Sequence, residues 1–242
     1  MISLNKKMLI VAITAAVTAL AQPSFASVFT FASFDYVGPG TVSYNNTTGV
    51  LSASNIDIKI RMNSGASGVL GALKHGAAYN TDYDAKLSFT AASLGSAAAY
   101  GVIGVQDLAL TSCDIELNSA LGGKTQFLTG TADIAQLEGR IGGTAGALLT
   151  STGAGATINY TSQFANVPGV ITEADLAWAF SSVSPSLTIS GANFANFNGI
   201  VTGSFGINGT NNAPEPASMA LLAGGSIGVA VMGRRRKAKL QA

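Results

Sequence analysis

Cysteine, histidine and charged residues are scarce in this chain of 242 residues. Cys113 is the only cysteine, so no intramolecular disulfide can form, and we expect it to be a small buried residue. His75 is the only histidine, which argues against a zinc site and makes it the base of any Ser-His-Asp triad. Between Ser27 and Ala213, the region that we call the body, there is no Gly-x-Ser-x-Gly motif. No spacing pairs His75 with Cys113 as base and nucleophile. These absences predict a protein that is not an enzyme and needs no cofactor, with His75 exposed in a loop.

Charge is sparse and unevenly distributed. Asp, Glu, Lys and Arg make up 10% of the chain, and the formal net charge is +1. Between Ser27 and Ala213, however, six basic residues face eleven acidic ones, which gives this body a net charge of −5. A mildly acidic body offers no basic patch to nucleic acid, so we exclude nucleic-acid binding. Its surface must consist mainly of Ser, Thr, Asn and Gly, which suits an extracellular protein.

The N-terminus has the composition of a secretory signal. Lys6–Lys7 provides a positive region, and Met8–Ala21 is an uncharged, mostly apolar stretch of the length that export signals use. Small residues then suit a signal peptidase, which would cut between Ala26 and Ser27. We therefore predict a signal peptide over residues 1–26 and export of the rest of the chain.

The C-terminal end combines a short motif, an apolar run and a basic cluster. Pro214-Glu215-Pro216 precedes Ala217–Gly233, which is 17 residues long and carries no charge. As a helix this run would span about 25 Å, slightly less than a ~30 Å hydrocarbon core. Arg234-Arg235-Arg236-Lys237 can hold its end at the cytoplasmic headgroups. The pattern predicts one transmembrane helix, with residues 208–213 as a linker that keeps the motif clear of the body.

These three elements resemble the PEP-CTERM sorting signal of Gram-negative bacteria, and the resemblance covers residues 214–242. It implies processing by an exosortase, an integral-membrane enzyme similar to cysteine proteases that recognises Pro214-Glu215-Pro216. Members of this family are often associated with exopolysaccharide production, with biofilm or floc formation and with the cell surface. The resemblance therefore implies a protein that stays briefly in the inner membrane and reaches the cell surface or the exterior after C-terminal processing.

The region between the two ends, residues 27–207, has the pattern of β-strands. Asn55–Asn63 alternates apolar and polar residues, as a strand does when one face contacts a core. Its inward side chains should be Ile56, Ile58, Ile60 and Met62. A turn cluster at Asn45–Gly49 predicts a hairpin between Thr41–Tyr44 and Val50–Ser54. Other strand candidates are Val28–Tyr36, Ala85–Ala91, Gly101–Leu110, Asp114–Asn118, Thr125–Leu137, Ala156–Gln163, Ser186–Ser190 and Gly199–Ile207.

This density of short strands favours an all-β domain with an antiparallel, sandwich-like or barrel-like fold. One segment departs from the pattern. Thr172–Phe180 predicts a short helix with an acidic first turn capped by Thr172, and with Trp178 in the core. Ser64–Gly76 is rich in small residues and predicts a loop or a weak helix.

Three acidic or amide side chains form a weak candidate metal site. Asn80, Asp82 and Asp84 alternate like the first three ligands of a calcium loop. The sixth and twelfth positions of that loop would be Ala85 and Ala91 rather than Gly and Glu, so this is not an EF-hand. The alternatives are an irregular calcium site and a hydrated turn between strands.

Two further groups of residues could act on sugars. Asp114 and Glu116 share one strand face and could pair as acid and base, although such positions are more often a solvated face. Tyr79, Tyr83 and Trp178 could stack on saccharides, although Trp178 is expected in the core. The leading hypothesis is a non-enzymatic surface or matrix protein, structural or associated with exopolysaccharide or biofilm. The alternatives are a carbohydrate-binding module and a secreted hydrolase that uses carboxylates.

Overall fold

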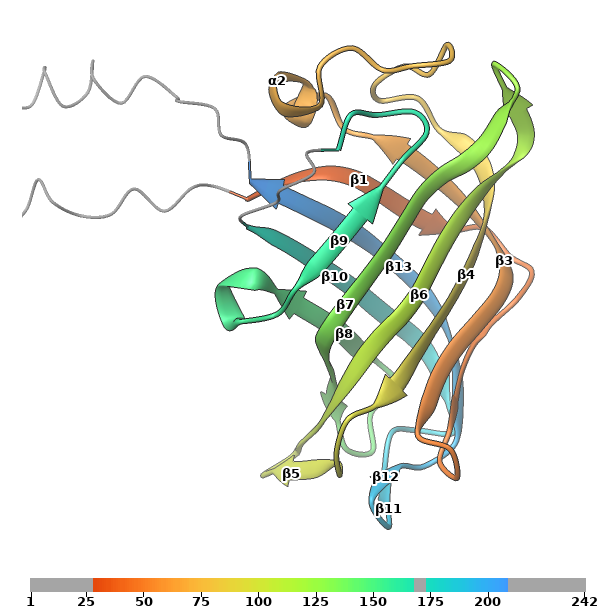
Figure 1. Cartoon of the computed structure of the whole chain (residues 1–242). Coiled ribbons are helices and arrows are strands. Elements are labelled where there is room, and N and C mark those ends of the chain that lie inside the picture. Colours follow the sequence, from red (N-terminus) through yellow and green to blue (C-terminus); the bar gives the residue numbers. More distant parts are fainter. Residues whose placement is uncertain (1–27, 168–172, 209–242) are drawn as a thin grey trace, which may run out of the picture. The chain divides into compact units, whose positions relative to one another are not determined.

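Alternation of apolar and polar residues places most of the described chain in antiparallel β-strands. The computed structural model describes residues 28–167 and 173–208 (Figure 1). Its strands are β1 (Val28–Tyr36), β2 (Val42–Asn45), β3 (Val50–Met62), β4 (Tyr83–Ser93), β5 (Ala98–Tyr100), β6 (Ile103–Leu121), β7 (Lys124–Arg140), β8 (Gly146–Ser151), β9 (Ile158–Thr161), β10 (Ala174–Ser184), β11 (Ile189–Ser190), β12 (Asn193–Phe194) and β13 (Phe197–Asn208). Short helical turns are η1 (Ser64–Ala66), α2 (Ser67–Leu70) and η2 (Thr152–Ala154). The prediction of an all-β antiparallel body is confirmed, as is the loop or weak helix at Ser64–Gly76.

Eight of the strands form one sheet that closes on itself. Neighbouring strands follow the order β6-β4-β3-β1-β13-β10-β8-β7, and pairing between β6 and β7 completes the ring. Strands β2, β5 and β9 attach to this ring, while β11 and β12 pair separately. The predicted sandwich-like arrangement is therefore replaced by a single closed, barrel-like sheet. Closure gives each of the eight strands a partner on both sides, which two stacked sheets would not do.

Two of these strands are longer than the sequence pattern indicated. Strand β3 joins Val50–Ser54 and Asn55–Asn63 through a bulge, where its pairing with β4 shifts register between Ala53 and Ile56. Asn55 has a φ of 52° at this bulge. Strand β6 likewise unites two predicted strands, and its pairing with β7 shifts register at several points. Bulges bend and twist long strands, which lets β3 and β6 follow the curve of a closed sheet.

The predicted hairpin and the inward face of β3 are confirmed. Strands β2 and β3 pair with Tyr44 opposite Leu51. The buried side chains on β3 include Ile56, Ile58, Ile60 and Met62. An alternation with period two is sufficient here, because one face of the strand contacts the core and the other contacts water.

The helix predicted at Thr172–Phe180 is wrong, because the described part of this segment forms β10. Thr172, its proposed cap, lies outside the described residues. From Ala174 onward, buried and more exposed residues alternate, and the strand pairs with β8 and β13. Leu176, Trp178 and Phe180 are the large inward residues of that alternation. Packing of this period-two face between two strands outweighs the modest helix propensity of its Glu, Ala and Leu residues.

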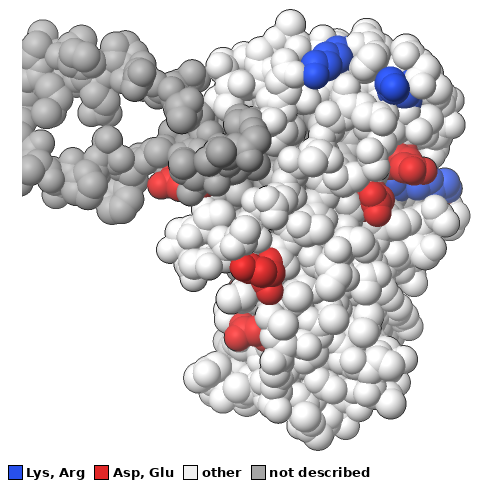
Figure 2. All heavy atoms as spheres, in the orientation of Figure 1, with Lys and Arg blue, Asp and Glu red and all other residues white. Residues whose placement is uncertain are grey.

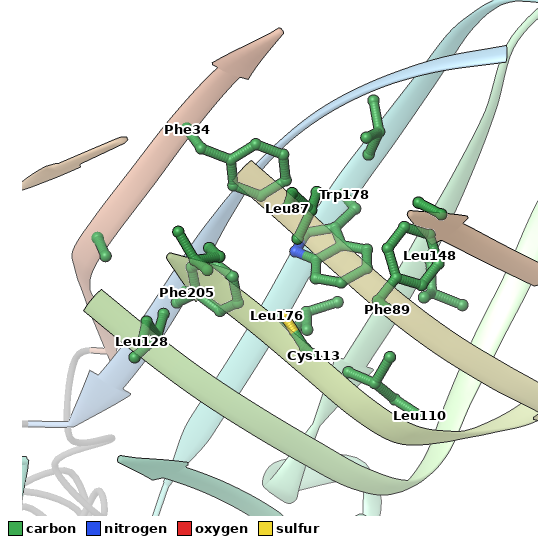
Figure 3. Packing of buried hydrophobic residues seen from close by; sticks show 14 of the residues in the cluster. Phe34, Leu87, Phe89, Leu110, Cys113, Leu128, Leu148, Leu176, Trp178 and Phe205 are labelled. Atoms are coloured by element: carbon green, nitrogen blue, oxygen red, sulfur yellow. The ribbon is translucent and has the colours of Figure 1, made fainter. Parts of the chain in front are cut away.

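Aromatic side chains form the centre of the core inside the closed sheet. Trp178 is 1% exposed, and its ring centroid lies 4.8 Å from that of Phe89, 5.9 Å from Phe34 and 6.0 Å from Phe205 (Figure 3). A side chain at Gly203 would collide with this packing, because an added Cβ would lie 2.3 Å from Trp178 Cδ1. The Trp178 Nε1 group is buried and has no hydrogen-bond partner among the described residues. Trp178 thus contributes large apolar contacts together with one unpaired donor.

Buried polar side chains close the core near β11 and β12. Gln106 is 1% exposed, and its Oε1 accepts a hydrogen bond from the Tyr44 hydroxyl at 2.7 Å. Its Nε2 donates to Ser93 Oγ at 2.9 Å, to the Gly95 carbonyl at 3.0 Å and to Asn193 Oδ1 at 2.6 Å. These bonds tie β2, β4 and β6 to the segment that carries β12. A buried amide of this kind is stable only because both of its ends are paired.

The predicted membrane and signal segments lie outside the described residues. This applies to residues 1–26, to the linker after Asn208 and to Ala217–Gly233. Within residues 28–167 and 173–208, no helix has the length and apolar character needed to span a membrane.

Candidate functional site

The sorting and processing positions lie outside the described residues. This holds for the cleavage position Ala26–Ser27, for Pro214-Glu215-Pro216 and for Arg234-Arg235-Arg236-Lys237. The structure does place the strand ends that lead to them, because Val28 at the start of β1 pairs with Asn208 at the end of β13. Both terminal segments are therefore joined to the body at adjacent strand ends.

The calcium candidates lie in the loop before β4 and at its start. Asn80 Oδ1 accepts from the Ser64 backbone N–H at 3.0 Å, and Asn80 Nδ2 donates to Ser64 Oγ at 2.9 Å. Asp82 forms an ion pair with Arg61, with 2.8 Å between Oδ1 and Nε. Calcium would have to compete with these contacts, and its binding at Asn80, Asp82 and Asp84 stays a prediction. In the described part of the chain, no three His, Cys, Asp or Glu side chains are grouped to hold a metal ion.

The lone histidine and the lone cysteine lie in different surroundings. His75 is exposed in the loop after α2, where its ring meets the Phe164 ring edge-on at 6.0 Å. Cys113 is buried in β6 (Figure 3), and burial raises the pKa of its thiol far above the ordinary value. The predictions of an exposed histidine and a buried cysteine are confirmed. A thiol that stays protonated in the core is a poor nucleophile, because the thiolate is the reactive form.

Asp114 and Glu116 lie on the outer face of β6. Asp114 stands opposite Ser88 on β4 and Thr129 on β7, and Glu116 stands opposite Lys86 on β4. Cross-strand neighbours of this kind are typical of a polar, solvated face. The structure places the two carboxylates as the alternation of the sequence predicted.

The aromatic residues considered for sugar stacking are buried or half-buried. Trp178 belongs to the core, as predicted. The Tyr79 hydroxyl donates to the Gly71 carbonyl at 2.6 Å, and the Tyr83 hydroxyl accepts from the Ala78 N–H at 2.8 Å. Tyr79 and Tyr83 are also packed, partly buried, against the core, so all three rings contribute to the packing of the body.

Sequence reasoning missed a groove on the outer face of the sheet, where β7 changes its partner. Strand β7 pairs with β9 over Thr129–Ala132 and with β8 over Gln136–Gly139. A cavity of about 440 Å³, which we call the outer groove, lies beside this change of partner. Its lining includes Asp107, Ile134, Gln136, Leu149, Ser151 and Asp175. Because these residues come from four strands, no local motif could have revealed them.

A row of cross-strand neighbours forms the floor of the outer groove. Asp107 on β6 stands opposite Gln136 on β7, which stands opposite Leu149 on β8, which in turn stands opposite Ala177 on β10. Asp175 lies two residues before Ala177 on the same strand. The groove therefore has a carboxylate on each side of an apolar centre.

Asp175 is the electrostatically unusual residue of the outer groove. Its side chain is half-buried, and within the described residues its carboxylate has neither an ion pair nor a side-chain hydrogen bond. Burial raises the pKa of this carboxyl above the ordinary value of 3.8. Asp107, by contrast, is exposed and accepts from Gln136 Nε2 at 3.3 Å. The charged form of Asp175 is thus disfavoured in the folded protein unless something pairs with it.

We expect Asp175→Asn to raise the melting temperature at neutral pH. Because the folded state binds the Asp175 proton more tightly than the unfolded state, this group stabilises the fold below pH 3.8. That stability is lost as pH rises through the pKa of the folded state. The melting temperature of wild type should therefore rise relative to that of the variant as the solution is acidified. Melting curves of both proteins at pH 4 and pH 7 measure this difference. An Asp175→Asn protein that is less stable than wild type at pH 7 would contradict the unpaired carboxylate.

Comparisons with known proteins identify the C-terminal segment. The family model of the PEP-CTERM protein-sorting motif matches residues 212–237. This match confirms the resemblance seen in Pro214-Glu215-Pro216, the apolar run and the basic cluster. No curated protein and no solved structure gives a significant match to the chain. The comparisons therefore identify the C-terminal motif, and the function of the body has to be inferred from its own residues.

Proposed function

Because the chain carries a PEP-CTERM protein-sorting motif at residues 212–237, we propose that it is an exported, non-enzymatic protein of the cell surface or extracellular matrix. The motif implies an exosortase as the processing enzyme and export to the cell envelope or surface. In this proposal a signal peptidase removes residues 1–26, and the exosortase then acts at Pro214-Glu215-Pro216. The single observation that carries the proposal is the motif itself.

A structural or exopolysaccharide-associated role for the body is supported by what its surface and core offer. Figure 2 shows a face with a few charged side chains separated by wide uncharged surface. The body is rich in hydroxyl and amide side chains, which exchange hydrogen bonds with hydrated polymers without strong dependence on salt. The closed sheet and its aromatic core provide a stable scaffold outside the cell. We propose association with exopolysaccharide or biofilm matrix on these grounds.

Carbohydrate binding is the second candidate function, and the outer groove favours it. Ligand sites are concave and mostly apolar, with a small number of placed polar groups. The outer groove combines Leu149 and Ile134 with Gln136, Ser151 and Asp175. This candidate does not compete with the first, because a matrix protein can hold its polymer through such a site.

The sorting proposal predicts that Glu215→Ala and deletion of residues 234–237 each leave uncleaved protein in the inner membrane. Glu215→Ala removes the charged centre of the processing motif, and the deletion removes the basic cluster that holds the segment. Intact mass of the protein recovered from membranes and from outside the cell measures both termini at once. Wild type should be found outside without residues 1–26 and without the apolar run.

Glu116→Ala is the matched control, because it removes an exposed glutamate from the body and leaves the motif intact. It should be processed and exported like wild type. Unchanged secretion and unchanged mass in both sorting variants would overturn the proposal. Full-length protein found soluble inside the cell would do the same.

A further inference from the structure

We propose that the outer groove binds an amino sugar, with the carboxylate of Asp175 as counter-ion to the ammonium group and with Leu149 and Ile134 against the apolar face of the ring. The inference deepens the proposed function, since the choice of a saccharide rests on a surface or matrix role. The site itself rests on the geometry and charge of the groove.

The size and position of the groove suit part of a polymer chain. Its volume of about 440 Å³ lies within the range of small-molecule sites, and it opens on the outer face of the sheet. Asp107 and Asp175 stand on β6 and β10, with β7 and β8 between them. Three strand spacings of ~4.8 Å separate these strands by about 14 Å. A ligand longer than one ring can therefore lie across the apolar centre and meet a carboxylate at each side.

The charges of the groove select a cationic ligand. Among the described residues that line it, two are acidic and none is basic. Asp107 has a neutral hydrogen-bond donor in Gln136, whereas Asp175 has no such partner among the described residues. Since a half-buried carboxylate is disfavoured when it is alone, an ammonium group that pairs with Asp175 regains the lost solvation. A neutral or anionic saccharide would leave this charge unpaired or oppose it.

The apolar part of the groove selects a ring with one apolar face. Leu149 and Ile134 are exposed large hydrophobic side chains, 39% and 46% accessible. Together with Ala177 they form a small apolar surface beside Ser151 and the amide of Gln136. The C–H face of a sugar ring can cover this surface while its hydroxyl groups meet the polar rim. The side chain of a lysine has an ammonium group but no such face.

The test is calorimetric titration of the full-length chain, purified in detergent, with a glucosamine hexamer. The N-acetylglucosamine hexamer is the matched neutral probe, and trilysine is the matched cationic probe without a sugar ring. Asp175→Asn removes the charge with little change in shape, and Asp84→Asn removes an exposed carboxylate outside the groove. We expect the glucosamine hexamer to bind best. Asp175→Asn should weaken its binding about 10- to 100-fold, as expected for a hydrogen bond between charged groups, whereas Asp84→Asn should leave it unchanged.

Four results would overturn the proposal. If the N-acetylated hexamer binds as tightly as the glucosamine hexamer, the ammonium group is not required for binding. If trilysine binds as tightly, the sugar ring is not required. Binding that is the same in wild type and Asp175→Asn, or no binding at millimolar concentration, would remove the site. Because the titration uses the unprocessed chain, its outcome is independent of whether Glu215→Ala blocks sorting, so failure of either proposal can be recognised separately.

Discussion

Trp178→Ala is expected to lower the free energy of unfolding by about 3–5 kcal/mol, the range found when a buried aromatic side chain is truncated. The Trp178 ring meets Phe34, Phe89 and Phe205 at centroid distances between 4.8 and 6.0 Å, so its removal leaves a cavity among rigid rings. Trp178 lies on β10, at the middle of the closed sheet's inner face (Figure 3). Denaturation in urea, followed by far-ultraviolet circular dichroism, measures the change.

Trp178→Phe is the informative companion to that substitution. It keeps an aromatic ring in the core and removes the buried Nε1–H donor, which has no partner within the part of the chain that the structure describes. Burial of an unpaired donor costs about 1–3 kcal/mol, which offsets part of the packing lost with the larger ring. Trp178→Phe should therefore be much less destabilised than Trp178→Ala. A loss below ~1 kcal/mol for Trp178→Ala would mean that the ring does not lie in a dry core.

Strand positions could be predicted wherever the pattern is local. Asn55–Asn63 has an unbroken period of two, and the structure buries the residues that this period selects. The order of the strands could not be predicted in the same way, because β1 pairs with β13 across almost the whole body. Closure of the sheet through β6 and β7 likewise depends on bulges, which look like strand ends in the sequence.

The error at Thr172–Phe180 has a related cause. Glu173, Ala174 and Leu176 favour helix locally, and the period-two pattern of Leu176, Trp178 and Phe180 is short. The strand forms because β8 and β13 lie on both sides of it, which is information that the segment does not contain. Tertiary pairing therefore decided a case in which the local signals disagreed.

The sorting motif and the outer groove also differ in whether their residues are close together in the sequence. The sorting motif is a linear signal that an enzyme reads along the chain, so Pro214-Glu215-Pro216 could be recognised from sequence and was matched by its family model. The outer groove is assembled from β6, β7, β8 and β10, and Asp175 gave no signal of its own because it stood within a segment predicted as helix. A groove of this kind becomes visible only when register places Asp107, Leu149 and Asp175 on one face.

Gln106→Leu is expected to lower the free energy of unfolding by about 2–5 kcal/mol, because each buried group left unpaired costs about 1–3 kcal/mol. Leucine has a similar size, so the loss comes mainly from hydrogen bonds. The Tyr44 hydroxyl loses its 2.7 Å acceptor, and Asn193 Oδ1 loses its 2.6 Å donor. Gln126→Leu, which replaces a more exposed glutamine on β7, should change stability by no more than ~0.5 kcal/mol. Urea denaturation of both variants measures the contrast.

The origin of that loss can be separated from packing by a second change at Tyr44. Tyr44→Phe alone leaves Gln106 Oε1 without its 2.7 Å donor, whereas in the Gln106→Leu background it removes a hydroxyl that has already lost its acceptor. The double variant should therefore be more stable than the sum of the two single losses predicts, by about 1–2 kcal/mol. Strict additivity of the two losses would show that the amide and the hydroxyl are not coupled, and that the end of the core near β12 is closed by apolar contacts instead.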